Sequence, residues 1–421
     1  MKRVIFFFPD RRIGGGPFYL LRMAVELSKS NEYEVYYIDY KDGYTHKIDI
    51  DVSKIKFIDF EDYSPSTIFI DDAVLFAPIH YLHNMPYFHL NTKVLFFNWH
   101  HECIPVLKNN MCFNDIELYK CMEIINKNNA QVFCDVGQWS ENNRYSLQDF
   151  NKNYVPVHIN MKNERAIPHI IDNNINICIL GRLVLDKIYS VINIIECAKK
   201  YNKKNIVIHI IGDGDQKDKL NAYKEVDGIE LRFLGVLSGD RLNNYLKNNI
   251  DILFAMGTSV LEGAAIGLPS IIIPYSIRPF HLDQFIYLYD TIGYCLGWDV
   301  NQLKYASVKK YSFNSIINYI YNENKKNEIG NKCFEYVENN HSVVSSTEHL
   351  KKYINSTTLK FKDIYSIYRI QCYINNIRMK KNKKYYKLFN CLNILKEIST
   401  NNYKKYYLFG CIPLLTIKIK C

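Results

Sequence analysis

The fold of this chain is decided by the stretch Gly257-Thr258-Ser259-Val260-Leu261-Glu262-Gly263-Ala264-Ala265-Ile266-Gly267-Leu268-Pro269. A glycine turn leads into two hydroxyl residues and an apolar helical pattern, which predicts a helix over about 259–266. The amino end of a helix attracts phosphate, and the carboxylate of Glu262, one turn in, can accept both hydroxyls of a ribose. The stretch therefore predicts a nucleotide-sugar contact, although an ordinary capped helix with Glu262 facing solvent explains the same residues.

Short strands and helices alternate on both sides of this stretch. The apolar runs 250–254 and 270–273 flank it and are typical of buried parallel strands. The same alternation occupies the preceding eighty residues, with predicted strands at 175–180, 206–211 and 231–234 and a helix at 188–198. Such a series predicts a doubly wound α/β domain, whose ligands bind at the carboxyl ends of the strands.

The first half of the chain shows a similar alternation. Arg3 to Phe8 reads as a first strand, and the triplet Gly14-Gly15-Gly16 separates it from a helix that begins at Pro17. The spacing of the triplet does not fit G-x-G-x-x-G, which disfavours a dinucleotide-dependent oxidoreductase. An irregular stretch at 154–175 then marks a linker. We therefore expect two doubly wound domains facing a cleft, at 1–165 and 170–350, followed by a tail at 351–421.

Two cations follow the predicted strand 175–180. Gly181-Arg182 comes directly after it, and Lys187 opens the next helix, so both side chains would project from the carboxyl edge of the sheet. A forked guanidinium and a point-charge ammonium together suit phosphate oxygens. Solvated surface cations are the plain alternative. After the next strand, Gly212 and Gly214 allow backbone to approach a ligand or simply make the turn.

These landmarks together resemble the donor domain of GT-B glycosyltransferases, and most of all the retaining group 1, family-four-like type. The resemblance spans about 175–275. It rests on the order and spacing of Gly181-Arg182 with Lys187, Gly212-Asp213-Gly214, Phe233-Leu234-Gly235, Asp251, and the run Glu262 to Pro269. The end of the chain, from Lys404 to Leu415, looks like a terminal element of bacterial surface-polysaccharide enzymes.

The resemblance implies a role for each matching position. Arg182 and Lys187 would hold the donor diphosphate and carry most of the catalysis. Glu262 would bind the ribose. Backbone at Gly181, Gly212, Gly214, Gly257, Thr258 and Ser259 would line the donor site, and Gly15 and Gly16 would face the donor from the first domain. It also implies a nucleotide-sugar co-substrate, with no cofactor and no metal.

One departure concerns the stereochemistry of transfer. The family often has a second glutamate eight positions before the ribose-binding one, where this chain has Phe254. Asp283-Gln284 faintly resembles the acidic-Gln pair of inverting GT-B enzymes, although it comes later than that pattern expects. Retention is favoured. An inverting transferase, a GT-B-fold epimerase and an inactive sugar-nucleotide binder stay open as alternatives.

Two histidines follow the predicted strand 93–97. His100 and His101 stand in the run Asn98-Trp99-His100-His101-Glu102, again at a carboxyl edge. An imidazole there would steady sugar hydroxyls in a retaining enzyme or deprotonate the acceptor in an inverting one, because imidazole titrates near neutral pH. A metal site is disfavoured, since no ligand spacing is matched and adjacent side chains on extended backbone point apart.

The positive charge of the chain is concentrated at its end. The whole chain has a net charge of +10, but residues 351–421 hold 16 Lys and Arg against only Asp363 and Glu397. Lysines alternate with Tyr, Phe, Ile and Leu from 357 to 421, which suits an anionic membrane surface. Single-stranded nucleic acid uses the same chemistry, but the acidic first 350 residues make it an unlikely partner. A solvated helical extension is the plain alternative.

The remaining sequence features concern location. No apolar run is long enough for a signal segment or a membrane span, and the 12 cysteines form no C-x-x-C pair, which favours reduced thiols. We therefore expect a cytoplasmic protein that associates peripherally with the inner face of the cell membrane. Its acceptor would be lipid-linked or a surface glycan, as in lipopolysaccharide, lipooligosaccharide or capsule synthesis.

Overall fold

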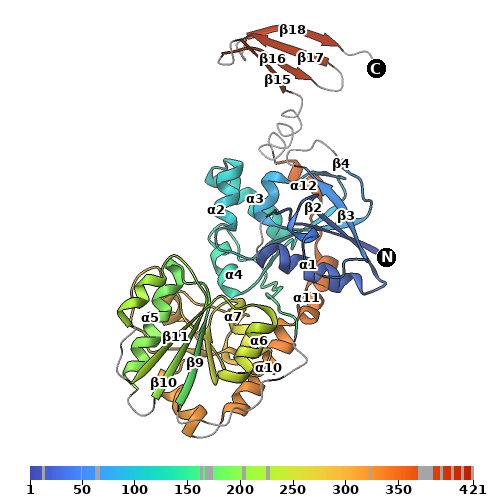
Figure 1. Ribbon diagram of the computed structural model, residues 1–421. Helices are drawn as coiled ribbons and strands as arrows, with labels where there is room; N and C mark the ends of the chain where they lie inside the picture. The colour runs from blue at the N-terminus through green and yellow to red at the C-terminus, as the bar shows by residue number, and fades with distance from the viewer. Residues whose placement is uncertain are drawn as a thin grey trace. The chain divides into compact units, whose positions relative to one another are not determined.

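The computed structural model describes residues 1–11, 15–48, 50–61, 67–161, 165, 174–201, 205–223, 228–322 and 325–367, and the backbone of four strands between 383 and 418. The chain divides into two units (Figure 1). Unit 1 comprises Met1–Phe133, Gln138–Asn153 and Lys351–Cys421, and unit 2 comprises Cys134–Gly137 and Tyr154–Leu350. Gly14 of the glycine triplet lies outside the described residues.

Unit 1 is built on a parallel sheet of six strands in the order β3-β2-β1-β5-β7-β8. Its central strands are almost fully buried, as expected for apolar runs without alternation. The strands are β1 Lys2–Phe7, β2 Tyr33–Tyr40, β3 Ile55–Phe60, β5 Ala73–Pro78, β7 Lys93–Asn98 and β8 Gln131–Phe133, with a small pair β4 Thr67–Ile68 and β6 Tyr87–Phe88. The helices are α1 Gly15–Ser28, η1 Tyr44–His46, η2 Ile79–Asn84, α2 Cys103–Met111, α3 Asp115–Lys127, α4 Val136–Asn143 and α12 Phe361–Tyr365.

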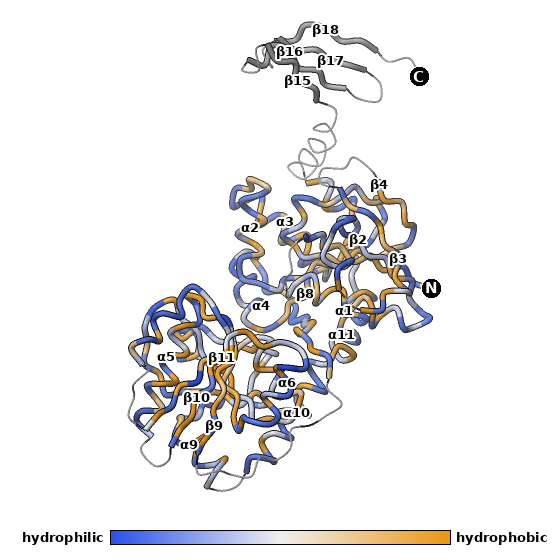
Figure 2. Tube along the Cα trace, in the orientation of Figure 1, coloured by the Kyte–Doolittle hydropathy of each residue, from blue (hydrophilic) through white to orange (hydrophobic). Residues whose placement is uncertain are grey.

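Unit 2 repeats this architecture with the order β11-β10-β9-β12-β13-β14, in which β14 alone is antiparallel. Helices α5 and α6 cover opposite faces of the sheet (Figure 1), and Figure 2 shows hydrophobic residues along β9 to β11 between them. The strands are β9 Asn174–Leu180, β10 Asn205–Ile211, β11 Ile229–Gly235, β12 Ile252–Ala255, β13 Ser270–Ile272 and β14 Ile286–Tyr287. The helices are α5 Leu185–Lys199, η3 Lys217–Tyr223, α6 Gly239–Asn249, α7 Thr258–Ala264, η4 Leu288–Asp290, α8 Val300–Tyr305, α9 Phe313–Ile317, η5 Asn318–Asn322, α10 Lys326–His341 and α11 Val343–Ser356.

The predicted fold class of two doubly wound α/β domains is confirmed. The borders of the two units follow from contacts between segments that are distant along the chain. Residues 154–161 pack with unit 2, where the backbone of Ile159 bonds to that of His341. The chain returns to unit 1 within α11, at Lys351. Just after this helix, the hydroxyl of Thr357 donates to the carbonyl of Val94 at 2.7 Å. The end of each unit is therefore set by long-range packing, which local sequence signals do not report.

The basic tail contains strands. An antiparallel sheet of four strands is formed by β15 Lys383–Leu388, β16 Leu392–Ser399, β17 Tyr403–Leu408 and β18 Ile412–Lys418, in chain order. The helical extension considered from the sequence is therefore wrong for these strands, because Tyr, Ile and Leu alternating with lysine suit a pleated strand better than a helix. Among the described helices, none combines the length and apolar character needed to cross a membrane.

Candidate functional site

The two cations predicted to bind phosphate lie together at the carboxyl edge of the unit 2 sheet. Arg182 and Lys187 line one small pocket, with Gly181 between strand and loop. Met256, which follows β12 and directly precedes Gly257, lines the same pocket. The remaining lining residues are Ile179, Leu180, Val191 and Ile273. A dense apolar floor beneath two cations lowers the local dielectric and strengthens their attraction for an anion.

The surroundings of Lys187 shift its pKa. Burial lowers its pKa below the ordinary lysine range, Asp186 opposes that shift, and the nearby Arg182 adds to it. The lysine backbone is held in the first turn of α5, where its amide donates to the carbonyl of Val184 at 2.9 Å. A partly desolvated ammonium next to a second cation is destabilised until an anion arrives.

The glycine turn after β10 holds the Arg182 loop in place. A Cβ atom on Gly212, whose φ is +141°, would meet the carbonyl oxygen of Gly181 at 1.9 Å, and one on Gly214 would meet that of Leu183 at 2.3 Å. The loops are also bonded, because the amide of Leu183 donates to the carbonyl of Asp213 at 2.9 Å. Both glycines are thus explained by close packing of two loops. Direct contact of either with a donor stays a prediction.

The helix predicted at 259–266 is α7, which runs from Thr258 to Ala264. Gly257 adopts φ +63° just before it, a conformation that favours glycine. Thr258 is exposed, and Ser259 and Glu262 are half-buried, so these side chains remain accessible. Gly263 packs against β12, since a Cβ there would meet the side chain of Leu253 at 2.4 Å. The small residues of the motif thus bring α7 close to the sheet.

Two departures from the family pattern have structural explanations. Phe254 has 0% exposure in the unit 2 core, where its ring packs against Phe285 and Phe313 at centroid distances of 5.5 and 5.8 Å. A glutamate could not ionise there without a large desolvation cost. Asp283 accepts a hydrogen bond at 2.6 Å from the backbone amide of Phe313, the first residue of α9. That bond gives its carboxylate a structural role.

The corresponding edge of unit 1 is aromatic. Gly16 lies at the start of α1, where a Cβ would meet the ring of Phe8 at 2.8 Å and that of Trp99 at 3.1 Å. Gly15 is exposed, and a Cβ built on it would have no neighbouring atom within 4 Å. Because Gly16 has no side chain, the start of α1 can lie close to the ring of Trp99, the residue before His100.

The adjacent histidines follow β7 in a turn. The rings of His100 and His101 have centroids 4.1 Å apart at an interplanar angle of 32°. The expectation that they point apart on extended backbone is therefore wrong, because residues 100–102 turn into α2 instead of continuing the strand. The Nδ1 atom of His100 accepts a hydrogen bond from the amide of Glu102 at 3.3 Å, which orients its ring.

A third imidazole, which the sequence analysis assigns to no site, belongs to this cluster. His80 follows β5, the neighbour of β7, and its ring contacts Phe8 and Tyr81. Burial lowers the pKa of His80 to about 4, with contributions from His83 and His100, so the ring is neutral near pH 7. The signal in the sequence was its position directly after a strand, shared with His100.

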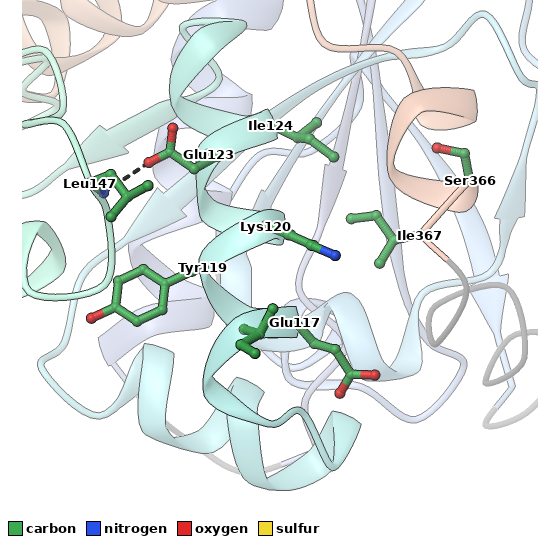
Figure 3. Close-up of a pocket in the computed structure, with 9 residues that line it drawn as sticks. Glu117, Tyr119, Lys120, Glu123, Ile124, Leu147, Ser366 and Ile367 are labelled. Atoms are coloured by element: carbon green, nitrogen blue, oxygen red, sulfur yellow. Dashed lines mark hydrogen bonds between the residues drawn. The ribbon is translucent and has the colours of Figure 1, made fainter.

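A larger apolar groove lies elsewhere on unit 1. It has a volume of about 810 Å³ and runs between α3 and the end of α12. Figure 3 shows Ile124 and Lys120 of α3 directed toward Ile367, and Leu147 beside Glu123, which accepts a hydrogen bond from the Leu147 amide at 2.9 Å. Ile116 and Leu147 on its walls are 67% and 82% exposed. Large exposed aliphatic side chains around a groove are typical of a contact surface.

Comparisons with known proteins agree with this architecture. No family model and no curated protein matches the sequence. Among solved structures, the chain is similar to the apo form of the lipopolysaccharide outer core galactosyltransferase WaaB, with 14% identity and a TM-score of 0.51 over 85% of this chain and 99% of that one. It is also similar to a glycosyltransferase from Rickettsia africae ESF-5, with 13% identity and a TM-score of 0.51 over 87% and 99%. The fold is therefore the GT-B fold implied by the sequence resemblance.

Proposed function

We propose that this protein is a glycosyltransferase that moves a sugar from a nucleotide-sugar donor to a glycan acceptor. The observation that carries the proposal is the shared pocket of Arg182 and Lys187 at the carboxyl edge of the unit 2 sheet, next to the loop that enters α7. The GT-B fold and the order of motifs around this pocket support the same function. Two clustered cations at a strand edge suit a diphosphate better than a neutral ligand.

The chemistry follows from where charge develops. When the bond between sugar and nucleotide breaks, negative charge accumulates on the departing diphosphate, and Arg182 and Lys187 stabilise it more strongly than they stabilise the ground state. Backbone at Gly257 to Ser259 would add hydrogen-bond donors, and Glu262 would hold the ribose. We assign no side-chain nucleophile, since a donor phosphate oxygen can accept the proton of the acceptor hydroxyl.

Retention of configuration is the stereochemistry that we propose. Two observations weigh against the inverting alternative based on Asp283-Gln284: Asp283 already bonds to a backbone amide, and it lies beyond the expected spacing. His100, with His101 and His80 beside it, would then steady the hydroxyls of the transferred sugar. A catalytically inactive sugar-nucleotide binder remains the second candidate, because Phe254 replaces the family's first glutamate and is buried.

The acceptor that we propose is lipid-linked and of the surface-glycan type. The similar galactosyltransferase WaaB is a lipopolysaccharide outer core enzyme, which supports an acceptor of that class. The apolar groove between α3 and Ile367 has room for hydrocarbon, and the chain continues from Ile367 into the basic tail. We therefore propose that the protein works peripherally at the inner face of the cell membrane, and that residues 357–421 contact anionic lipid.

The test is a panel of sugar nucleotides scored by thermal stabilisation of the full chain, followed by transfer assays with the stabilising donor. We expect one nucleotide to raise the Tm, and a transferred product whose anomeric configuration matches the donor. Stabilisation without turnover would favour the inactive binder, and an inverted product would favour the inverting enzyme. Release of an epimerised free sugar without acceptor would favour the epimerase. No stabilisation by any nucleotide would contradict the proposal.

A further inference from the structure

The tail contains a repeated sequence with a constant offset of 20 positions. Residues 383–398 and 403–418 align without a gap. The identical pairs are Lys384 and Lys404, Tyr386 and Tyr406, Leu388 and Leu408, Phe389 and Phe409, Cys391 and Cys411, and Leu395 and Leu415, and aliphatic residues match at 392 and 412 and at 394 and 414. Self-similarity at a fixed period is the mark of a repeated structural unit.

The strand pairing repeats with the same offset. Every paired position of β15 and β16 recurs twenty residues later in β17 and β18, from Lys383 with Ile398 and Tyr403 with Lys418 at one end to Leu388 with Leu392 and Leu408 with Ile412 at the other. The register shift also recurs, after Tyr386 in the first hairpin and after Tyr406 in the second. The sheet is therefore a tandem pair of equivalent β-hairpins, joined by the pairing of β16 with β17.

Register positions divide the sheet into two chemically different faces, since directly paired residues of antiparallel strands share a face. One face, here called the apolar face, contains Tyr386, Leu388, Leu392, Leu395, Tyr406, Leu408, Ile412, Leu415 and Ile417, with Lys384, Glu397, Ser399 and Lys404 at one end of the sheet. The other, the basic face, contains Lys383, Lys387, Lys396, Lys405 and Lys418 with Tyr385, Tyr403 and Tyr407, and also Asn393, Ile398, Pro413 and Thr416. Both hairpins contribute to both faces, so each hairpin is by itself amphipathic.

We propose that the two hairpins are equivalent membrane-binding units that bind an anionic bilayer surface bivalently. This inference rests on the proposed membrane location and specifies the device that achieves it. The apolar face would lie at the boundary of headgroups and acyl chains, with tyrosines at headgroup level. Lysines near the surface would each add about a fivefold preference for anionic lipid.

Bivalency explains why the unit is duplicated. A single weak membrane anchor, such as one acyl chain, gives marginal and reversible binding, and stable attachment needs a second signal. Joining two units in one sheet makes the second contact intramolecular, which raises the overall affinity by about a hundredfold to ten-thousandfold without a new type of contact. A two-stranded hairpin is also marginally stable alone, whereas four paired strands support each other.

The test compares matched lysine pairs in the full chain. The variants Lys383→Gln/Lys384→Gln and Lys404→Gln/Lys405→Gln each remove two adjacent charges, one from each face, at the same end of the sheet. Lys384 and Lys404 are equivalent positions, whereas Lys383 and Lys405 correspond to Tyr403 and Tyr385. We expect each pair to weaken binding to vesicles with about 30% phosphatidylglycerol by a similar factor of about thirtyfold, and the four-substitution variant by about the product. Lys199→Gln/Lys200→Gln, at the end of α5 and its C-cap, is the control and should leave vesicle binding unchanged.

The outcomes separate this inference from the proposed function. Unequal effects, with one pair carrying nearly all of the binding, would overturn the equivalence of the hairpins while leaving membrane attachment intact. If the wild-type chain does not bind these vesicles at all, the proposed membrane location fails as well, whereas donor-dependent transfer in solution tests the enzyme separately. Equal binding to pure phosphatidylcholine, preference for single-stranded oligonucleotide, or a lysine-dependent dimer by sedimentation would each overturn the proposed partner.

Discussion

The two six-stranded sheets have the same strand order at their centres but opposite chemistry at their carboxyl edges. In unit 2 the edge carries Arg182 and Lys187 on loops held by glycines, whereas in unit 1 it carries Trp99 and a group of imidazoles. One edge concentrates positive charge, and the other offers aromatic rings and imidazole hydrogen-bonding groups. The comparison teaches that the same strand order can carry different chemistry at its carboxyl edge. Under the proposed function, one edge would bind the donor diphosphate and the other the transferred sugar.

The largest effect is expected from loss of either cation. Arg182→Ala and Lys187→Ala should each lower turnover by about 100- to 1,000-fold, because each removes one preorganised charge from the departing diphosphate. Steady-state transfer assays with purified variants measure this. Arg241→Ala, an exposed arginine on α6 of the same unit, is the control and should retain normal turnover. If both pocket variants turned over at the wild-type rate, the donor-binding role proposed for Arg182 and Lys187 would be contradicted.

The next effect concerns the loop that supports Arg182. Gly212→Ala should destabilise unit 2 by about 3 kcal/mol, since its Cβ would overlap the carbonyl of Gly181 and its φ of +141° disfavours alanine. Gly228→Ala is the matched control, because Gly228 also has a positive φ but nothing within 4 Å of the added Cβ. Its cost should be near 1 kcal/mol. If the two variants lost equal free energy of unfolding in urea, the close contact between Gly212 and Gly181 would not contribute to stability.

A smaller effect is expected on the imidazole side. His100→Ala should lower turnover by about tenfold and leave the affinity for nucleoside diphosphate unchanged, because the side chain belongs to unit 1 and acts on the sugar. A parallel loss of nucleotide affinity would contradict the division of tasks between the two edges. Nucleotide titrations and kinetics on the same preparation distinguish the two outcomes.

The smallest effect is a pH dependence. Burial lowers the pKa of Lys187, so the ammonium loses its proton at a lower pH than an exposed lysine, and donor affinity should fall as the pH rises through that value. The variant Lys187→Arg stays protonated throughout and should bind donor with a flat alkaline profile. An identical decline in wild type and variant would assign the pH dependence to another group.

Much of this architecture could be predicted from the sequence. Apolar runs such as Arg3 to Phe8 and 206–211 mark buried parallel strands, and the glycine and charge landmarks of unit 2 placed Arg182 and Lys187 at one edge. What the sequence could not predict depends on tertiary contacts. Three features depend on segments that are distant along the chain. They are the packing of residues 154–161 with unit 2, the hydrogen bond from the Phe313 amide to Asp283, and the burial of His80.

The tail shows a different limit. Its charge and aromatic content predicted a partner, but charge alone does not distinguish a helix from a strand. The twenty-residue repeat was visible in the sequence, and comparing the tail with itself would have found it. Pairing register, which decides the two faces, follows only from the backbone.

Titration of nucleoside diphosphates into the wild-type chain, Arg182→Ala and Lys187→Ala tests the central claim most directly. With UDP, GDP and ADP as probes, we expect calorimetry to detect one of them binding the wild type. Each variant should lose at least about tenfold in affinity, as expected for loss of one charge-assisted hydrogen bond. Equal affinity of the wild type and both variants for the bound nucleotide would contradict the claim that these two cations hold the donor.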